Sequence, residues 1–159
     1  MNKANTLLGY KDAQYAFYLP NSPLLPQNWH HTQTDAIESI IQLNGNHWRK
    51  IFTIMAKITC QNHDWKTYRD QFLLKKNEQI HINADILSPT AQIHIISGQS
   101  AAEQLNLNLK GFQHINSQTP QKPLKVFQSQ LLVPYLDYRQ YPNVLIEDTR
   151  QYLNRLTLK

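Results

Sequence analysis

The chain has 159 residues, of which 41% are hydrophobic and 17% are charged, and its formal net charge is +5. This length suits one domain with a buried core, and aromatic and branched residues along the whole chain exclude a disordered protein. No apolar run approaches the roughly 18 residues that a membrane span requires, and the N-terminal residues resemble no secretory signal. The single cysteine, Cys60, cannot form an internal disulfide, which favours a reducing, cytoplasmic location. We predict one α/β domain over residues 1–159.

The first predicted element is a strand over residues 15–19, in which the alternate large side chains of YAFYL share one face. Pro20 ends the strand because proline has no amide hydrogen to donate. Pro23 and Pro26 follow closely, which indicates an extended, ordered loop that begins with Asn21 and Ser22.

Two helices are predicted next, over residues 35–45 and 46–59. Asp35 and Glu38 stand at capping-box spacing, and Gly45 ends the first helix. The second helix has the clearest pattern in the chain, because apolar residues recur at three- and four-residue spacing: Trp48, Ile51, Phe52, Met55 and Ile58.

A third helix is predicted over residues 63–76, with Asp64 as its cap and with Trp65, Tyr68 and Phe72 pointing inward. The tetrapeptide QIHI then occurs twice, at residues 79–82 and 92–95, and two copies do not make a repeat protein. The second copy is the better strand.

The second copy of QIHI continues through Ile96 to a Ser-Gly turn and a short helix ending near Leu105. Residues 106–125 are polar and contain Gly and Pro, which predicts a long loop. A strand within residues 129–136, with Pro134 near its end, and a helix over residues 143–159 complete the chain.

Strands that alternate with helices require crossover connections, and such connections favour parallel strands with helices on both faces. We therefore predict an α/β three-layer sandwich with a short, mostly parallel sheet flanked by helices. Ligands of such sheets bind at the carboxyl ends of the strands. The loops after residues 19, 97 and 133 should meet there.

The turn of Ser97, Gly98, Gln99 and Ser100 is the first candidate binding segment. Its amides begin a helix, which suits an anion, but the same corner occurs in most α/β proteins for packing alone. Neither GxGxxG nor GxxxxGK[ST] is present. With Asn21 and Ser22 from the first loop, this turn is predicted to bind a ligand.

The loop after the last strand carries the second candidate segment, with Tyr135, Asp137, Tyr138 and Arg139 close together. Aromatic rings beside an arginine suit stacking on bases and contact with phosphate. Asp137 is the acidic group of this loop that can serve as a general base if it is buried. The alternative is structural: Asp137 pairs with Arg139 or caps a turn, and the tyrosines pack around the neighbouring prolines.

The order of these elements resembles that of the uracil-DNA glycosylase superfamily, with YAFYLPNSP, NHWRKIFTIMAKI, IHIISGQSAAEQL and LLVPYLDYRQYPN in sequence. The resemblance implies the fold. The last loop has Pro134-Tyr135-Leu136-Asp137 where that family carries a histidine, so the resemblance does not extend to the groups that excise a base.

Other chemistries have little support in the sequence. The seven histidines show no zinc-ligand spacing, and His81 and His94 are expected on the polar side of their strands. Cys60 is expected to be a structural thiol rather than a nucleophile. We predict no metal and no organic cofactor.

Three hypotheses for function remain open. The first is binding of nucleic acid or a nucleotide-like ligand at the strand ends, which the positive charge favours although the basic residues are scattered. The second is an enzyme that uses Asp137 as a base on a small substrate. The third is a protein-interaction module without catalysis. The sequence does not give the oligomeric state.

Overall fold

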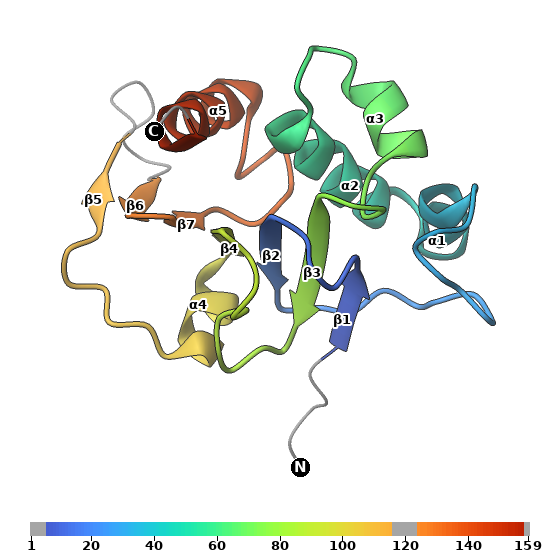
Figure 1. Ribbon diagram of the computed structural model, residues 1–159, viewed down its shortest axis with the longest axis horizontal. Helices are drawn as coiled ribbons and strands as arrows, with labels where there is room; N and C mark the ends of the chain where they lie inside the picture. The colour runs from blue at the N-terminus through green and yellow to red at the C-terminus, as the bar shows by residue number, and fades with distance from the viewer. Residues whose placement is uncertain (1–5, 116–123, 158–159) are drawn as a thin grey trace.

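The computed structural model describes residues 6–115 and 124–157 (Figure 1). Within these residues seven strands form one sheet in the order β1-β3-β2-β4-β7-β6-β5. The strands are β1 (Thr6–Gly9), β2 (Tyr15–Leu19), β3 (Glu78–Ile82), β4 (Ile93–Ser97), β5 (Gln113–His114), β6 (Lys125–Phe127) and β7 (Gln130–Val133). The helices are α1 (Ala36–Asn44), α2 (Asn46–Thr59), α3 (Trp65–Gln71), α4 (Gln99–Leu105) and α5 (Asn143–Thr157).

The centre of the sheet is parallel, and its edges are antiparallel. β2 pairs in parallel with both β3 and β4, and β4 pairs in parallel with β7. β1 is antiparallel to β3, and β5 and β6 are added to β7 as antiparallel strands. The predicted parallel arrangement of β2, β4 and β7 is confirmed, so the carboxyl ends of these strands lie along one edge.

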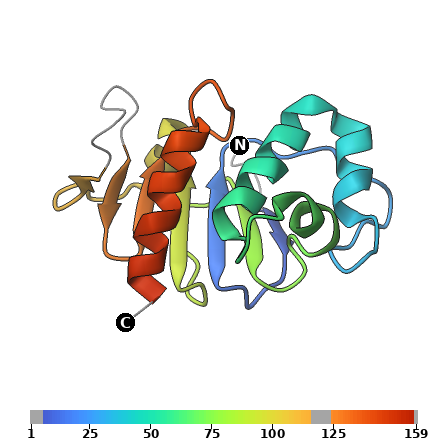
Figure 2. The ribbon, with the colours of Figure 1, turned by 90° about the horizontal axis from the view of Figure 1, so that it is seen from above.

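The helices form two unequal layers on the sheet. Figure 2 shows α1, α2, α3 and α5 on one face, where α5 lies over β4 and β7. We call this the covered face. The short α4 lies on the opposite face, below the sheet in Figure 1. We call this the open face. The predicted three-layer sandwich is therefore confirmed, with one helix in its second layer.

The pairing register assigns each strand residue to a face, because directly paired residues point to the same side of a sheet. Ile80, Phe17, Ile95 and Leu131 are paired across four strands and are fully buried under the covered face. A second cluster lies under α4, where Tyr18 and Ile96 pack against helix residues Ala101 and Leu105. A parallel sheet that is buried on both faces reads as continuous apolar sequence, as YAFYL and IHIIS do.

Several local expectations are wrong. Phe72 is 54% exposed rather than inward-facing, because α3 ends at Gln71. Asp64 caps α3 as predicted, by accepting a hydrogen bond from the Thr67 amide. The capping box of α1 does not form, because the Asp35 side chain makes no cap hydrogen bond.

The sequence pattern does not indicate the antiparallel edge strands. β1, β5 and β6 are two to four residues long, too short for an alternating pattern to identify them. Part of the loop predicted over residues 106–125 is β5, and β6 begins at its last residue. Residues 116–123 of that prediction lie outside the described residues. No helix in the described part of the chain is long and apolar enough to cross a membrane.

Candidate functional site

A cavity of about 510 Å³ lies on the open face at the carboxyl ends of β4 and β7. We call it the strand-end cavity. Its apolar wall comes from the two strands, the loop after β7, α4 and the connection after α4: Ile96, Leu132, Val133, Pro134, Ala102 and Leu109. Its volume falls within the range of small-molecule sites, which are usually mostly apolar with a few polar groups.

The floor of this cavity follows from the strand register. Ile96 pairs with Leu132, and Leu132 pairs with Lys125, so these three side chains form a row on the open face. α4 covers the Ile96 end of the row. The Lys125 end of the row extends beyond α4, and there the side chains of Leu132 and Lys125 line the cavity.

The charged side chains among the described lining residues of the cavity are all positive. Lys125 and Arg139 supply positive charges, and Gln99 and Gln140 supply amides. None of the described residues that line the cavity carries a carboxylate. The side chains therefore favour a ligand with an apolar body, hydrogen-bonding groups and negative charge.

The Ser97–Ser100 turn is largely occupied by structural contacts. Ser97 is fully buried, and its hydroxyl donates to the Pro134 carbonyl at 3.2 Å. The Gly98 amide donates to the Val133 carbonyl at 2.9 Å. Both bonds join the end of β4 to the end of β7. Of the four turn residues, Gly98 and Gln99 line the strand-end cavity, and Ser97 and Ser100 do not.

Tyr135 connects three segments at this edge of the sheet. Its hydroxyl shares a hydrogen bond of 2.7 Å with Nε2 of His47, in the first turn of α2. It also bonds the side chain of Asn21, which follows β2. Burial raises the pKa of Tyr135, the Asn21 hydrogen bond lowers it in part, and the charge of Asp137 raises it further.

Gly98 lies beside the Tyr135 ring, and its backbone conformation rather than the ring favours glycine. Its φ of +86° is left-handed, and a Cβ atom placed there would lie 3.8 Å from the ring. The Tyr135 ring therefore lies beside the backbone where β4 turns into α4. It forms one wall of the strand-end cavity.

Asp137 lies near the cavity but does not line it. One of its carboxylate oxygens accepts the Arg139 amide at 3.0 Å, and the other lies 3.9 Å from Nζ of Lys50. Its carbonyl also accepts the amides of Gln140 and Tyr141. These contacts are those of a turn-capping residue. Catalysis by Asp137 stays a prediction.

Tyr138 is separated from the other predicted residues. Nζ of Lys57 lies 4.9 Å from the centre of the Tyr138 ring and 4.8 Å from that of Trp65. The same ammonium donates to the Asn143 side chain at 3.1 Å. Tyr138 thus packs on the covered face, whereas Tyr135 and Arg139 line the cavity on the open face. A protein-interaction role for Tyr138 stays a prediction.

Ser22 is exposed and donates only a local hydrogen bond, to the Pro23 carbonyl at 3.2 Å. Asn21 reaches the site through Tyr135. The structure thus brings together Gly98, Gln99, Tyr135 and Arg139 around the cavity, with Asn21 and Asp137 beside them, whereas Ser97 is buried in the contact between β4 and β7. It leaves Ser22, Ser100 and Tyr138 outside.

Sequence reasoning missed Lys125, Leu109 and His47. Lys125 and Leu109 belong to the segment that was predicted as a loop, and only the β6–β7 register turns Lys125 toward the cavity. His47 precedes the apolar stripe of α2 and carries no motif. Its contact with Tyr135 joins positions 88 residues apart, which no local pattern predicts.

The two histidines expected on the polar side of their strands lie beside Tyr18 on the open face. His94 is only 8% exposed, and its Nδ1 lies 2.7 Å from the Tyr18 hydroxyl. The His81 ring stacks on Tyr18 with 5.1 Å between ring centres. The expectation is wrong for His94, because the β3–β4 loop and α4 cover that part of the face.

Cys60 is buried, in agreement with the structural role predicted for it. Its thiol donates to the Asn62 carbonyl at 2.8 Å, and Nη1 of Arg150 donates to its carbonyl at 2.9 Å. Within the described residues, no three His, Cys, Asp or Glu side chains are grouped to hold a metal.

The fold and the cavity define an α/β protein with a mixed sheet, parallel at its centre, and a ligand-sized cavity at the strand ends. Residues 6–154 match the protein family described as "Family of unknown function (DUF6942)", and the chain belongs to this family. None of the curated proteins and none of the solved structures compared with the chain matches it.

Proposed function

We propose that this protein binds a small, anionic, nucleotide-like ligand in the strand-end cavity. The observation that carries the proposal is the cavity itself: about 510 Å³ at the carboxyl ends of β4 and β7, with Lys125 and Arg139 and no carboxylate among its described lining residues. A base or other planar group rests on the partly exposed Leu132, and a phosphate pairs with the two cations.

The topology supports this position. The helices that follow β2 lie on the covered face, and the helix that follows β4 lies on the open face. The sheet therefore changes its winding direction between β2 and β4, which is where open α/β sheets bind ligands. The Asn21 side chain and the Tyr135 ring lie at this point, and the cavity lies on the β4–β7 side of it.

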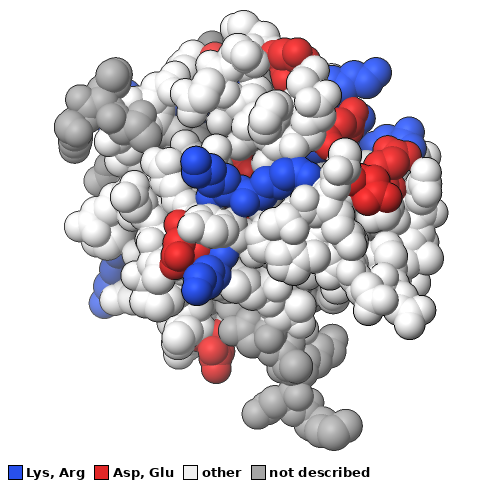
Figure 3. Space-filling view, turned by 45° about the vertical axis from the view of Figure 1, so that its right-hand side comes forward, with Lys and Arg blue, Asp and Glu red and all other residues white. Residues whose placement is uncertain are grey.

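The ligand is more consistent with a single nucleotide than with a long nucleic acid. Figure 3 shows one face of the molecule, on which Lys and Arg lie in small groups beside Asp and Glu. A duplex or long single strand is usually bound by an extended basic surface. A cavity with two cations instead suits one or two phosphate groups.

The resemblance to the uracil-DNA glycosylase superfamily adds support for a base as part of the ligand. It rests on the order of elements, and we propose it at the level of base binding alone. Base excision is not part of the proposal, because Tyr135 and Asp137 stand in the loop where that family carries its histidine. The buried, unpaired Cys60 agrees with the cytoplasmic location that we propose.

Isothermal titration with AMP tests the proposal. We expect a Kd between about 1 and 100 μM, and Arg139→Gln should raise it about tenfold or more, since a charge-assisted hydrogen bond contributes about 1.5–3 kcal/mol. Lys76→Gln is the matched control, because Lys76 is exposed and does not line the cavity. The control should bind as the wild type does.

Absence of AMP binding at about 5 mM, or equal affinity in Arg139→Gln and the wild type, would overturn the proposal. A ten-nucleotide single strand of thymidine serves as a parallel ligand. If it binds more tightly than AMP and its affinity falls steeply with salt, the surface binds nucleic acid instead of a single nucleotide.

A further inference from the structure

A second cavity, of about 280 Å³, adjoins the strand-end cavity on the open face. Three residues line both cavities: Gln99, Ala102 and Leu109. The two spaces are therefore neighbours that share one partition. Nothing in the sequence pattern indicated this second space.

Leu109 is the part of the partition that does not belong to α4. Gln99 and Ala102 are helix residues, and the Gln99 side chain donates to Glu103 one turn further along at 3.0 Å. Leu109 instead belongs to the connection between α4 and β5, and it is 50% exposed although it touches both cavities. Its side chain thus borders both cavities and remains half exposed.

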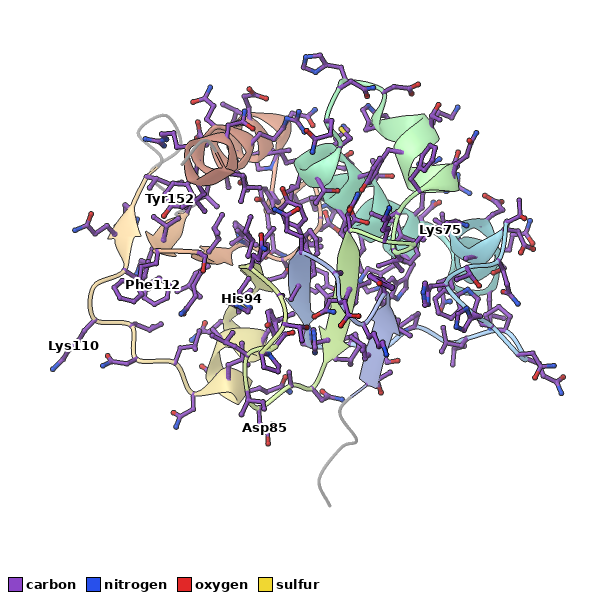
Figure 4. All side chains as sticks on the ribbon, in the orientation of Figure 1. Lys75, Asp85, His94, Lys110, Phe112 and Tyr152 are labelled. Atoms are coloured by element: carbon purple, nitrogen blue, oxygen red, sulfur yellow. The ribbon has the colours of Figure 1, made fainter. Side chains whose placement is uncertain are left out.

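The connection around Leu109 is held by local hydrogen bonds. The Phe112 amide donates to the Leu109 carbonyl at 3.2 Å, and the Lys110 amide donates to the Asn108 side chain at 3.1 Å. Figure 4 shows Lys110 pointing away from the protein at the outer end of this connection. Phe112 anchors the end of the connection, with its ring centre 5.6 Å from that of Phe127. The anchor lies outside both cavities, so a smaller side chain at position 109 leaves it in place.

The chemistry of the two cavities differs. The strand-end cavity has an apolar floor and two cations. The second cavity is lined by Glu103, Asn106 and Gln99 along with apolar groups. A ligand that extended past Leu109 would place one anionic group against the two cations of the first cavity, and the amides of Gln99 and Asn106 could donate hydrogen bonds to its extension in the second.

We infer that the Leu109 side chain sets the length of the ligand that the strand-end cavity accepts. This inference rests on the proposed function. With leucine at this position the first cavity is closed toward the second, so compact aromatic anions are preferred. A smaller side chain joins the two spaces and admits extended anions.

Two dyes of different length test this inference. 1-Anilinonaphthalene-8-sulfonate (ANS) is a compact aromatic sulfonate, and bis-ANS is its covalently linked dimer. Fluorescence titrations give a Kd for each dye, and the ratio of the bis-ANS Kd to the ANS Kd measures length preference. Leu109→Ala should lower this ratio about tenfold, in the range that pocket size commonly controls. Leu109→Trp should leave the ratio at or above the wild-type value.

Leu43→Ala is the matched control. Leu43 is 48% exposed, a fraction similar to the 50% of Leu109, and it lies in α1 on the covered face. Its ratio should equal that of the wild type. An unchanged ratio in Leu109→Ala, or the same change in Leu43→Ala, would overturn the inference. If AMP displaces ANS from the wild type but the ratio does not change in Leu109→Ala, the inference fails and the proposed function stands. If AMP binds but does not displace ANS, or the wild type binds neither dye, the inference fails and the proposed function stands; if AMP itself does not bind, both fail.

Discussion

The two faces of the sheet differ in how completely they are covered. On the covered face, Phe17, Ile80, Ile95 and Leu131 lie at 0% exposure under a layer of four helices. On the open face, α4 covers Tyr18 and Ile96, but Leu7 is 43% exposed and Phe127 is 38% exposed. One face therefore contributes most of the buried apolar area, and the other has room for a ligand.

This difference follows from the connections between strands. The β2–β3 connection contains α1, α2 and α3, and all of them pack on one side. The β3–β4 connection contains no helix, and the described part of the β4–β7 connection contains one helix, the seven-residue α4, before β5 and β6. A single short helix cannot cover a sheet of seven strands. The comparison thus predicts that substitutions on the covered face, and on the part of the open face under α4, change stability, while those on the uncovered part of the open face change binding.

The largest expected effect belongs to the centre of the covered face. Phe52 is fully buried in α2, and its ring centre lies 5.4 Å from that of Trp48. Phe52→Ala should lower the free energy of unfolding by about 3–5 kcal/mol, because the substitution leaves a cavity in a closely packed core. Phe127→Ala on the open face should cost about 1 kcal/mol or less, because the ring is already partly exposed. Urea unfolding measures both, and equal losses would contradict the comparison.

A smaller effect is expected where the open face is best covered. The Tyr18 hydroxyl accepts the Ser88 amide at 2.8 Å and bonds Nδ1 of His94 at 2.7 Å. Tyr18→Phe leaves these buried groups without a partner and should cost about 1–3 kcal/mol. Tyr152→Phe is the control, because its hydroxyl donates to the Gln128 carbonyl in an exposed position. That variant should lose less than about 1 kcal/mol. A larger loss in Tyr152→Phe than in Tyr18→Phe would show that burial of the hydroxyl does not determine how much free energy of unfolding is lost.

The central fold could be predicted because its signals are local. The apolar stripe of α2 is read at three- and four-residue spacing, and Trp48 and Ile51 are buried as expected. The strands β2 and β4 are apolar runs that end at Pro20 and at Ser97-Gly98. Alternation of such strands with helices indicates a parallel centre.

The open face could not be predicted in the same way, because its geometry depends on register between distant segments. Lys125 lines the cavity only because it pairs with Leu132, which in turn pairs with Ile96. The segment before β6 reads as a polar loop, and nothing in it indicates a third member of that row. Tyr135 and Arg139 were predicted for the site from composition, yet Tyr138 in the same loop packs over Lys57 on the covered face. Composition alone does not tell which way each side chain of a turn points.

The buried part of the open face should make the free energy of unfolding depend on pH, because His94 lies there. Burial lowers the pKa of His94 below its ordinary value of 6.5 in the folded protein. The unfolded chain therefore binds a proton more readily than the folded chain does, so stability is fully present above about pH 6.5 and is lost as the pH falls toward the folded pKa. Burial also lowers the pKa of His81, and the charge of His94 adds to this effect.

The difference between the wild type and His94→Gln isolates this contribution. The glutamine side chain can still accept a hydrogen bond from Tyr18 but does not titrate. Its unfolding free energy should fall less than that of the wild type between about pH 6.5 and pH 5. Gln61→Ala, an exposed substitution that removes no titratable group, should follow the wild-type curve. Parallel curves for the wild type and His94→Gln would show that His94 binds protons equally in both states.

The smallest effect on stability, and the sharpest separation of the two faces, is expected from Lys125→Gln. Lys125 is partly exposed on β6, and its side chain lies at the cavity floor beside Leu132. Removing its charge should change the free energy of unfolding by less than about 0.5 kcal/mol, since partly exposed polar positions contribute little.

The same substitution should weaken AMP binding about three- to tenfold, because one of the two cations that face the phosphate is removed. Lys66→Gln, an exposed substitution in α3 on the covered face, should change neither quantity. Thermal unfolding and titration on the same samples give both values. If Lys125→Gln unfolds more easily but binds AMP as the wild type does, then Lys125 supports the sheet edge and the cation pair is not a ligand site. The distinction between a stabilising face and a binding face would then fail at β6.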